Sequence, residues 1–470
     1  MSESNLSSND DMSNILELQK KAHIKAGAVS AKVRIDRLNR AISVLENNSS
    51  EFCEAMSEDF GNRSIQQSKM TDVDGAIGPL KHAIKHLHSW MKPEKRPTTF
   101  PFNLLGGRSH IEYQPLGVVG CISPWNFPVQ LTFSPLAGVF GAGNRTMIKP
   151  SEFTPITSEL MKSTLEAAFD RDELAVFTGG SEVGSNFSSL PFDHLLFTGA
   201  TAIARHVMRS AAENLVPVTL ELGGKSPVIV GRSADIALAA RNVMTGKTMN
   251  AGQICLAPDY VMLPEESREE FVAAAQATIA DMYPHIKDNP DYTSVVNDRH
   301  FSRLNNYVND AEAKGAQVVK INPAEEDFSQ QQNHKIPPTL IIDPTDDMLV
   351  MQEEIFGPIL PIKSYQEVDE TIDYVNSYDR PLGLYYFGKD RREETAVLEK
   401  TTSGGVTVND VIMHVAQENL PFGGVGPSGM GAYHGIDGFK TFSHTKSVYR
   451  QSSVVSKLVA KMGPPYKKAS

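Results

Sequence analysis

The sequence predicts an α/β protein built from two units in series, each with a parallel sheet. Short apolar runs alternate with amphipathic helical stretches between residue 116 and about residue 408. The chain has 470 residues, about three times a typical domain of ~150 residues, so two or three folding units are expected. Hydrophobic residues make up 40% of the chain, which is ordinary for a globular protein with a buried core.

The N-terminal part is predicted to be helical. Residues 1–14 carry three acidic side chains and no apolar stretch, so we expect a flexible tail and no secretory signal. From residue 14 to about 60, apolar residues recur at spacings of three and four, which is typical of packing helices. Residues 92–108 are rich in Pro and Gly and are predicted to form a connector or a protruding hairpin.

The first α/β unit follows this connector. Its apolar runs predict strands at 116–122, 146–149, 173–177 and 194–197, with a helix at 156–169. Such alternation is typical of a Rossmann-like parallel sheet, in which loops at the carboxyl ends of the strands form a crevice that suits a dinucleotide. A second alternation predicts strands at 226–230 and 257–263, with helices at 235–250 and 267–282.

Charge and composition argue against several classes of protein. There are 45 Lys and Arg against 56 Asp and Glu, and the net charge of −11 opposes binding to nucleic acid. Residues 113–144 carry no charge, but prolines interrupt them, so no membrane span is predicted. The cysteines Cys53, Cys121 and Cys255 form no CxxC pair and no HExxH motif occurs. We therefore predict neither disulfides nor a metal site, and expect a cytoplasmic protein.

Three residues are candidates for chemistry. Cys255, in NAGQICLAPDY, has small and polar neighbours of the kind that a nucleophilic thiol needs, although a cysteine is more often a small buried hydrophobe. Glu221, in LELGGKSP, ends an apolar run, where its carboxylate could be a general base or a surface charge. Asn126, in SPWNFPVQL, could donate to an oxyanion or cap a helix.

The usual nucleotide-binding fingerprints are missing from this sequence. There is no GxGxxG at a strand-to-helix turn and no GxxxxGK[ST]. In FTGATAIARHVM, a strand runs into Gly199 and then into a helix, so that backbone amides could approach a phosphate. That signal is weak by itself, because such a glycine is more often purely structural.

Seven motifs, in order along the chain, resemble those of the aldehyde dehydrogenase superfamily. They are SPWNFP, MIKPSE, FTGAT, LELGGKSP, GQIC, EEIFGP and PFGGVGPSGMG. The likeness covers residues from about 15 to 450, and chance agreement across seven ordered motifs is negligible. The ending at residues 431–448 resembles the class 3 branch, and within it bacterial coniferyl aldehyde dehydrogenases.

The resemblance implies NAD(P)-dependent oxidation of an aldehyde to a carboxylic acid, with an aromatic, coniferaldehyde-like substrate. Cys255 matches the thiol that forms a thiohemiacetal and then a thioester, and Asn126 with the backbone N–H of Cys255 matches the oxyanion site. Glu221 matches the base that activates water for hydrolysis of the thioester.

The resemblance also implies a set of cofactor-binding residues: Trp125, Lys149, Glu152, Gly199, Leu222, Glu354 and Phe356. Lys149 and Glu152 match residues at the adenosine ribose, and Glu152 would repel a 2′-phosphate, which favours NAD although NADP is not excluded. Glu354 and Phe356 match residues at the nicotinamide ribose and ring. Ala200 and Ala204 stand where the family commonly has Ser and Gly, so a phosphate-binding hydroxyl is lost.

With this resemblance we expect the aldehyde dehydrogenase fold in the following parts. A cofactor-binding domain comprises 15–95 and 115–222, a catalytic domain comprises 223–410, an oligomerisation arm comprises 96–114 and 411–450, and 451–470 is a C-terminal tail. Class 3 likeness and the arm together suggest a homodimer. Three other activities remain as alternatives: a dehydrogenase of medium or long aliphatic aldehydes, a CoA-acylating aldehyde dehydrogenase, and a cysteine hydrolase. A non-enzymatic protein is the fourth alternative.

Overall fold

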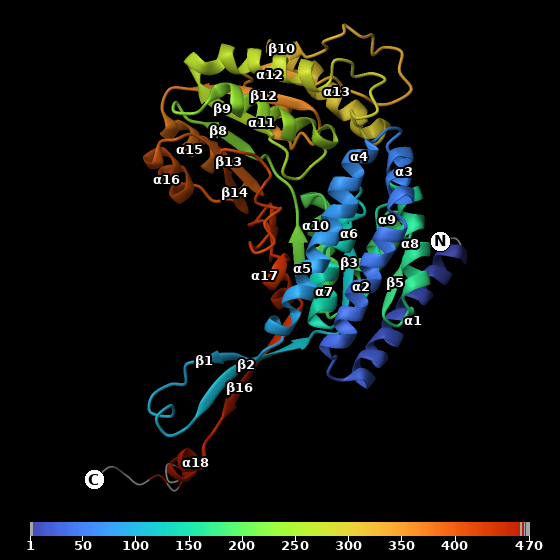
Figure 1. The fold of residues 1–470 in the computed structure, drawn as a ribbon, viewed down its shortest axis with the longest axis vertical. Coiled ribbons are helices and arrows are strands. Elements are labelled where there is room, and N and C mark those ends of the chain that lie inside the picture. The colour runs from blue at the N-terminus through green and yellow to red at the C-terminus, as the bar shows by residue number, and fades with distance from the viewer. Residues whose placement is uncertain (1–2, 461–462, 465, 467–470) are drawn as a thin grey trace.

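The computed structural model describes residues 3–460, 463, 464 and 466, and our expectations for the other terminal positions lie outside these residues. The chain forms two lobes and a long arm (Figure 1). The first lobe contains a six-stranded sheet, the second lobe a seven-stranded sheet, and the arm a three-stranded sheet. The predicted α/β class with parallel sheets is confirmed.

The sheet of the first lobe has the strand order β15-β7-β6-β3-β4-β5. Its strands are β3 (Val118–Ile122), β4 (Arg145–Lys149), β5 (Leu174–Val176), β6 (His194–Thr198), β7 (Val218–Glu221) and β15 (Gly429–Met430). All pairings are parallel except that of β15 with β7. Because β4 and β5 lie on one side of β3 whereas β6 and β7 lie on the other, the strand order reverses between β3 and β6. Ligands bind at such switch points in open α/β sheets.

Helices cover both faces of this sheet because its strands alternate apolar side chains between the faces. Val118 and Met147 pack with the helices α1 (Glu3–Ala26), α9 (Ser181–Ser188) and α10 (Thr201–Glu213). Val119 and Ile148 pack on the opposite face, with α2 (Ala31–Asn47), α3 (Ser49–Asp59), α5 (Gly75–Trp90), α7 (Leu136–Ala142) and α8 (Pro155–Ala168). Shorter helical segments are α4 (Ile65–Ser68), η1 (Lys69–Asp74) and α6 (Gln130–Phe133).

The expectation of a flexible tail through residue 14 is wrong for the described residues, because α1 begins at Glu3. Met12, Ile15 and Leu16 lie on one face of this helix and are buried against the sheet. The side-chain amide of Gln19 also donates to the carbonyl of Thr146, at 3.0 Å. These contacts are long-range, and the polar composition of the first residues gave no sign of them.

The sheet of the second lobe has the order β10-β11-β12-β9-β8-β13-β14, with only β10 antiparallel. Its strands are β8 (Pro227–Val230), β9 (Tyr260–Pro264), β10 (Gln317–Lys320), β11 (Thr339–Ile342), β12 (Ile359–Tyr365), β13 (Gly383–Phe387) and β14 (Gly405–Val408). The helices α11 (Ile236–Thr248) and α12 (Arg268–Met282) pack on one face. On the other lie α13 (Asp298–Ala313), α14 (Leu349–Gln352), α15 (Val368–Asn376) and α16 (Arg391–Lys400). Two short turns are η2 (Met249–Gly252) and η3 (Glu265–Ser267).

The arm consists of β1 (Glu94–Arg96), β2 (Arg108–Pro115) and β16 (Ser443–Arg450), in the order β1-β2-β16. It extends away from both lobes and ends near α18 (Ser453–Ala460), and α17 (Gly435–Thr441) leads into β16 (Figure 1). The stretch 92–108, predicted to be a connector or hairpin, runs out along this arm. Residues 453–460 of the expected C-terminal tail are helical.

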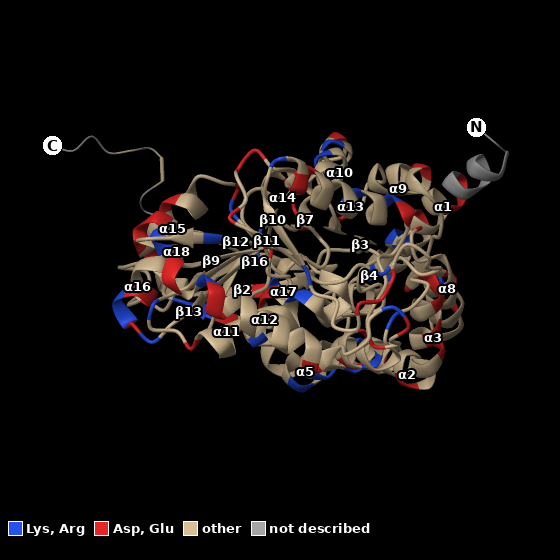
Figure 2. Ribbon diagram, turned by 90° about the horizontal axis from the view of Figure 1, so that it is seen from above, with Lys and Arg blue, Asp and Glu red and all other residues tan. Residues whose placement is uncertain are grey.

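Charged residues of both signs are interspersed along the outer helices, including α2 and α16 (Figure 2). Among the described residues, no helix combines the length and the apolar character needed to cross a bilayer.

Candidate active site

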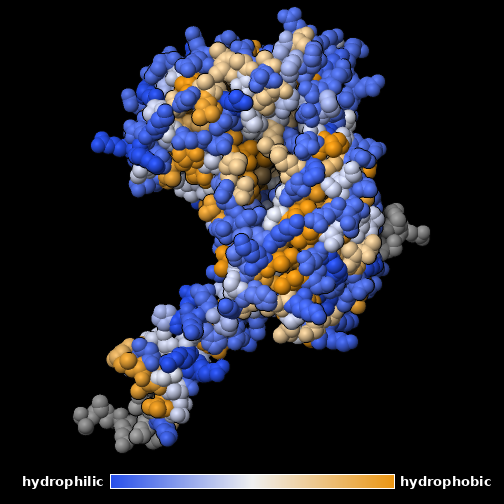
Figure 3. Space-filling view, viewed as in Figure 1, coloured by the Kyte–Doolittle hydropathy of each residue, from blue (hydrophilic) through white to orange (hydrophobic). Residues whose placement is uncertain are grey.

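The predicted site residues gather where the two lobes meet. Four strands of the first sheet end beside them: β3 before Trp125 and Asn126, β4 at Lys149, β6 before Gly199, and β7 at Glu221. Since these strands are parallel, their carboxyl ends share one edge of the sheet. The second lobe contributes loops that precede its strands, with Cys255 ahead of β9 and the segment 354–356 ahead of β12. Figure 3 shows a hollow with apolar side chains between the lobes.

The loop that carries Cys255 is held in an unusual backbone conformation. Asn250, Ala251 and Gly252 all have positive φ, at 50°, 51° and 73°. Such values are uncommon for Asn and Ala and persist only where surrounding contacts determine them. A Cβ on Gly252 would collide with the carbonyl oxygen of Gly357, so only glycine fits there. The turn therefore docks closely on the loop that precedes β12.

The Cys255 thiol is half-buried, whereas Cys53 and Cys121 are buried in the core. Burial raises the pKa of the Cys255 thiol, and the carboxylates of Glu221 and Glu354 raise it further. The backbone N–H groups of Cys255 and Leu256 act in the opposite direction and stabilise the thiolate. The Cys255 thiol is therefore within electrostatic reach of two acidic side chains and of two main-chain N–H groups.

Asn126 links the two lobes through its side chain and its backbone. It is 4% exposed, and its Nδ2 donates to the carbonyl oxygen of Gln253 at 3.1 Å. In return, Nδ2 of Asn250 donates to the carbonyl oxygen of Asn126 at 3.0 Å. An amide group has two N–H donors, and the described residues accept one hydrogen bond from the Asn126 amide.

Glu221 ends strand β7 inside the site and is 1% exposed. Neither of its carboxylate oxygens has a partner among the described residues. Burial raises the pKa of Glu221 well above its ordinary value. Its charge also raises the pKa of the buried Tyr433, as does that of Cys255, so these three side chains lie within electrostatic reach of one another. A desolvated carboxyl group of this kind suits proton transfer.

Lys149 and Glu152 form an ion pair at the carboxyl end of β4, with 2.8 Å between Nζ and Oε2. Lys149 is 3% exposed, whereas the Glu152 side chain is partly open. Gly199 lies in the turn between β6 and α10, and its N–H donates to the carbonyl oxygen of Glu221 at 3.0 Å.

Helix α10 begins shortly after Gly199. Ala200 is its N-cap residue, and no side chain caps the helix in the described part of the chain. Ala204 is buried in the core below. Leu222 is also buried, and its N–H donates to the carbonyl oxygen of Ser428 at 3.1 Å.

Glu354 and Phe356 approach the site from the second lobe. A Cβ on Gly223 would collide with the Glu354 carboxylate, which accepts a hydrogen bond from the N–H of Gly224. Burial raises the pKa of Glu354 to about 7. The ring of Phe356 lies edge-on to that of Trp125, with centroids 5.4 Å apart. Glu354 and Phe356 thus contact residues of the first lobe at Gly223, Gly224 and Trp125.

Sequence reasoning missed two buried cations near this site. Arg63 lies next to Asn126, and its contacts are described below. Lys247, on α11, is fully buried, its Nζ has no partner among the described residues, and burial lowers its pKa to about 8. Lys247 lies on the stretch 235–250, which was predicted to be a helix, and its charge on that stretch was the available signal. Arg63 lies just beyond the helical pattern of residues 14–60, and no local pattern marked it.

Comparison with known proteins agrees with this architecture. The sequence profile of the aldehyde dehydrogenase family matches residues 1–448, and the chain belongs to that family. It is an oxidoreductase that converts aldehydes to carboxylic acids, as the family does with NAD or NADP.

Two relatives and one solved structure are especially similar. A "probable coniferyl aldehyde dehydrogenase" of Caulobacter vibrioides is 63% identical, over 97% of this chain and 94% of the relative. A coniferyl aldehyde dehydrogenase of a Pseudomonas species is 55% identical, over 98% and 95%. The substrate-bound AldH of Staphylococcus aureus is 35% identical, covers 96% of this chain and 99% of its own, and has a TM-score of 0.88.

Proposed function

We propose that the chain oxidises its aldehyde through a thioester on Cys255, with Asn126 as oxyanion donor and Glu221 as general base. The observation that carries this proposal is the position of the Cys255 sulfur. It is half-buried, within electrostatic reach of Glu221, and in the loop to which the amide of Asn126 is hydrogen-bonded.

The residues of the first lobe fit a nicotinamide dinucleotide. The crevice lies where the strand order reverses, and the uncapped start of α10 follows the glycine turn, so its free N–H groups suit a phosphate. Lys149 and Glu152 would hold the adenosine ribose, with Trp125, Gly199 and Leu222 along the crevice. Glu354 and Phe356 would hold the nicotinamide ribose and ring.

The reaction begins when the thiol of Cys255 releases its proton to solvent water and the sulfur attacks the carbonyl carbon of the aldehyde. The carbonyl oxygen becomes an alkoxide, to which the free N–H of Asn126 and the backbone N–H of Cys255 donate. A nicotinamide dinucleotide held by Glu354 and Phe356 would supply the hydride acceptor, and loss of hydride from this carbon would leave a thioester on Cys255.

Hydrolysis of the thioester completes the cycle. Glu221 removes a proton from a water molecule, whose oxygen attacks the acyl carbon. The C–S bond then breaks, the carboxylic acid leaves, and the thiolate of Cys255 is restored. Because Glu221 is buried and its oxygens have no partner in the described residues, it is available for this water.

We infer that NAD is preferred over NADP. Glu152 accepts a hydrogen bond from a ribose 2′-hydroxyl, whereas its charge repels a 2′-phosphate. Lys149 is already paired with Glu152 and is less available to the phosphate.

For the substrate we propose an aromatic aldehyde of the coniferaldehyde type. This proposal is supported by the names of two relatives at 63% and 55% identity.

We also propose that the chain acts as a cytoplasmic homodimer joined through the arm. Strand β16 pairs with β2 on one edge, and no other described strand pairs with its second edge. An open edge of eight residues is a template for pairing with another chain. Light scattering of the purified protein should give twice the monomer mass, and a monomer at micromolar concentration would contradict this. The three free thiols suit a reducing compartment, which cell fractionation can check.

The central experiment is a panel of aromatic and aliphatic aldehydes assayed with NAD and with NADP. We expect the highest kcat/KM for coniferaldehyde with NAD, with no requirement for CoA. A higher kcat/KM for long aliphatic aldehydes would overturn the substrate proposal. An acyl adduct trapped during turnover should lie on Cys255 by mass spectrometry, and an adduct elsewhere would overturn the mechanism.

A further inference from the structure

A buried ion pair lies directly behind Asn126. Arg63 and Asp72 have fully buried side chains, and Nη2 of Arg63 lies 2.5 Å from Oδ2 of Asp72. The guanidinium group is also 5.0 Å from the ring centres of both Phe60 and Phe127. The pair is thus enclosed by aromatic rings, one of which belongs to the residue that follows Asn126.

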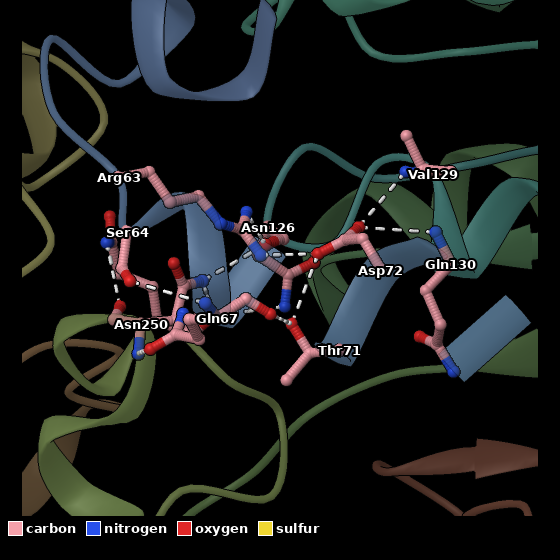
Figure 4. Close-up of polar contacts among 10 residues, drawn as sticks. Arg63, Ser64, Gln67, Thr71, Asp72, Asn126, Val129, Gln130 and Asn250 are labelled. Carbon is pink, nitrogen blue, oxygen red and sulfur yellow. Dashed lines mark hydrogen bonds and ion pairs between the residues drawn. The ribbon is translucent and has the colours of Figure 1, made fainter. Parts of the chain in front are cut away.

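This ion pair holds the loop of Asn126 at two points (Figure 4). Nη1 of Arg63 donates to the carbonyl oxygen of Asn126 at 2.7 Å. Oδ1 of Asp72 accepts the N–H groups of Val129 and Gln130, each at 3.2 Å. The backbone is therefore fixed at the peptide group that directly follows the Asn126 side chain, and again three and four residues further along the chain.

The same segment also supports the loop of Cys255. Oε1 of Gln67, four residues after Arg63, accepts the N–H of Asn250 at 3.0 Å. Nδ2 of Asn250 donates to the carbonyl oxygen of Asn126, so this oxygen receives hydrogen bonds from both Arg63 and Asn250 (Figure 4). Residues 63–72 consequently contact both sides of the oxyanion site.

A buried ion pair is a poor source of net stability. Removing two charges from water carries a large free-energy cost for each ion, and well-packed apolar residues often stabilise a fold as well or better. What the pair does provide is fixed geometry, and a misplacement of about 1 Å in a catalytic group can reduce a rate by about 100-fold.

We propose that Arg63, paired with Asp72, is a positioning residue that aims the Asn126 amide at the developing oxyanion. This proposal rests on the proposed role of Asn126. Among the described residues, Arg63 makes no hydrogen bond to Cys255, and it acts through the backbone of the Asn126 loop.

The chain offers a matched control in Arg37. It is also buried, its Nε lies 2.9 Å from a carboxylate oxygen of Glu173, and its Nη1 donates to the carbonyl oxygen of Asn144 at 3.1 Å. It therefore resembles Arg63 in burial, ion pairing and bonding to a backbone carbonyl, but it fixes α2 to the start of β4.

The test is a double-mutant cycle on the full-length protein, read by the rate of the NADH burst, which precedes thioester hydrolysis. Arg63→Lys keeps a positive charge beside Asp72, but it removes the guanidinium group that contacts both Asp72 and the carbonyl oxygen of Asn126. We expect it to slow the burst about tenfold to 100-fold. In an Asn126→Ala background, the same change should slow the burst by less than about twofold, because the donor that it aims is absent.

Arg37→Lys should leave the burst rate within about twofold, although it lowers Tm as a buried change does. Should Arg63→Lys not fold, Asp72→Asn takes its place, since it keeps an oxygen for Val129 and Gln130. The proposal is overturned if the fold-losses in burst rate from Arg63→Lys and Asn126→Ala multiply in the double mutant. It is also overturned if Arg63→Lys lowers Tm but leaves the burst rate unchanged. If Asn126→Ala by itself costs less than twofold, the proposed oxyanion role fails instead.

Discussion

Nδ2 of Asn126 lies 3.1 Å from the carbonyl oxygen of Gln253, two residues ahead of Cys255. This hydrogen bond joins the loop after β3 in the first lobe to the loop before β9 in the second. Because both loops contribute to the proposed oxyanion site, the distance between its two donors depends on how the lobes dock. The predictions below test the residues around this junction.

Cys255→Ala should abolish aldehyde oxidation, since no other described thiol is accessible in the site. Cys53→Ala and Cys121→Ala are matched controls, because both thiols are buried in the core. We expect them to retain activity with some loss of stability. NADH formation measured for the three variants checks this, and residual turnover in Cys255→Ala would exclude the thioester route.

Thiol labelling of the native protein should modify Cys255 first, and slowly at neutral pH. Burial and the charges of Glu221 and Glu354 raise the pKa of this thiol, so its labelling rate should still be rising at pH 9. Removing one of these charges with Glu354→Gln should increase the rate at a fixed pH. Iodoacetamide kinetics with peptide mapping provide the measurement, and a plateau near pH 7 would contradict the stated electrostatics.

Glu221→Gln should separate the two halves of the reaction. The variant is expected to give one NADH per active site and then to stall, because the thioester forms but its water is not activated. Stopped-flow absorbance and intact-mass analysis check the burst and the acyl adduct. Steady turnover at the wild-type rate would show that another group is the base, and turnover restored only by added CoA would favour the acylating alternative.

The stability of the protein should fall with rising pH because of Glu221. Its pKa in the folded chain is well above the ordinary value of 4.5, so the folded state binds more protons than the unfolded state above that pH. The stabilisation is complete at acidic pH and is lost as the pH rises through the folded pKa. Tm of Glu221→Gln should therefore exceed that of the wild type by an amount that grows from pH 5 to pH 9. A constant difference in Tm would contradict the raised pKa.

Glu152→Gln should weaken the preference for NAD. Removing a negative charge within a few ångströms of a 2′-phosphate, and freeing Lys149, should raise the NADP/NAD ratio of kcat/KM about tenfold. Glu159→Gln, an equal charge change on an exposed part of α8, is the control and should change neither value. Steady-state kinetics with NAD and with NADP measure this ratio, and an unchanged ratio in Glu152→Gln would contradict the prediction.

Much of this protein follows from local sequence. Buried runs such as VVGCI and HLLFT predicted strands close to β3 and β6, because apolar runs of this length fit a sheet that is covered on both faces. The candidate side chains were found in the same way, since Cys255, Glu221 and Asn126 each lie in a motif read over a few residues. The prediction of a tail failed at Met12, whose burial depends on a sheet more than 100 residues away.

By itself, then, the sequence determined the α/β class, the order of the elements and the type of chemistry. Only the tertiary structure decided that Arg63 and Asp72 lie behind Asn126, that Asn250 and Ala251 adopt positive φ, and that Lys247 is buried. The physical reason is that burial, ion pairing and backbone strain depend on which distant segments come into contact. A local pattern specifies a helix or a strand, but not the neighbours that its charged side chains meet.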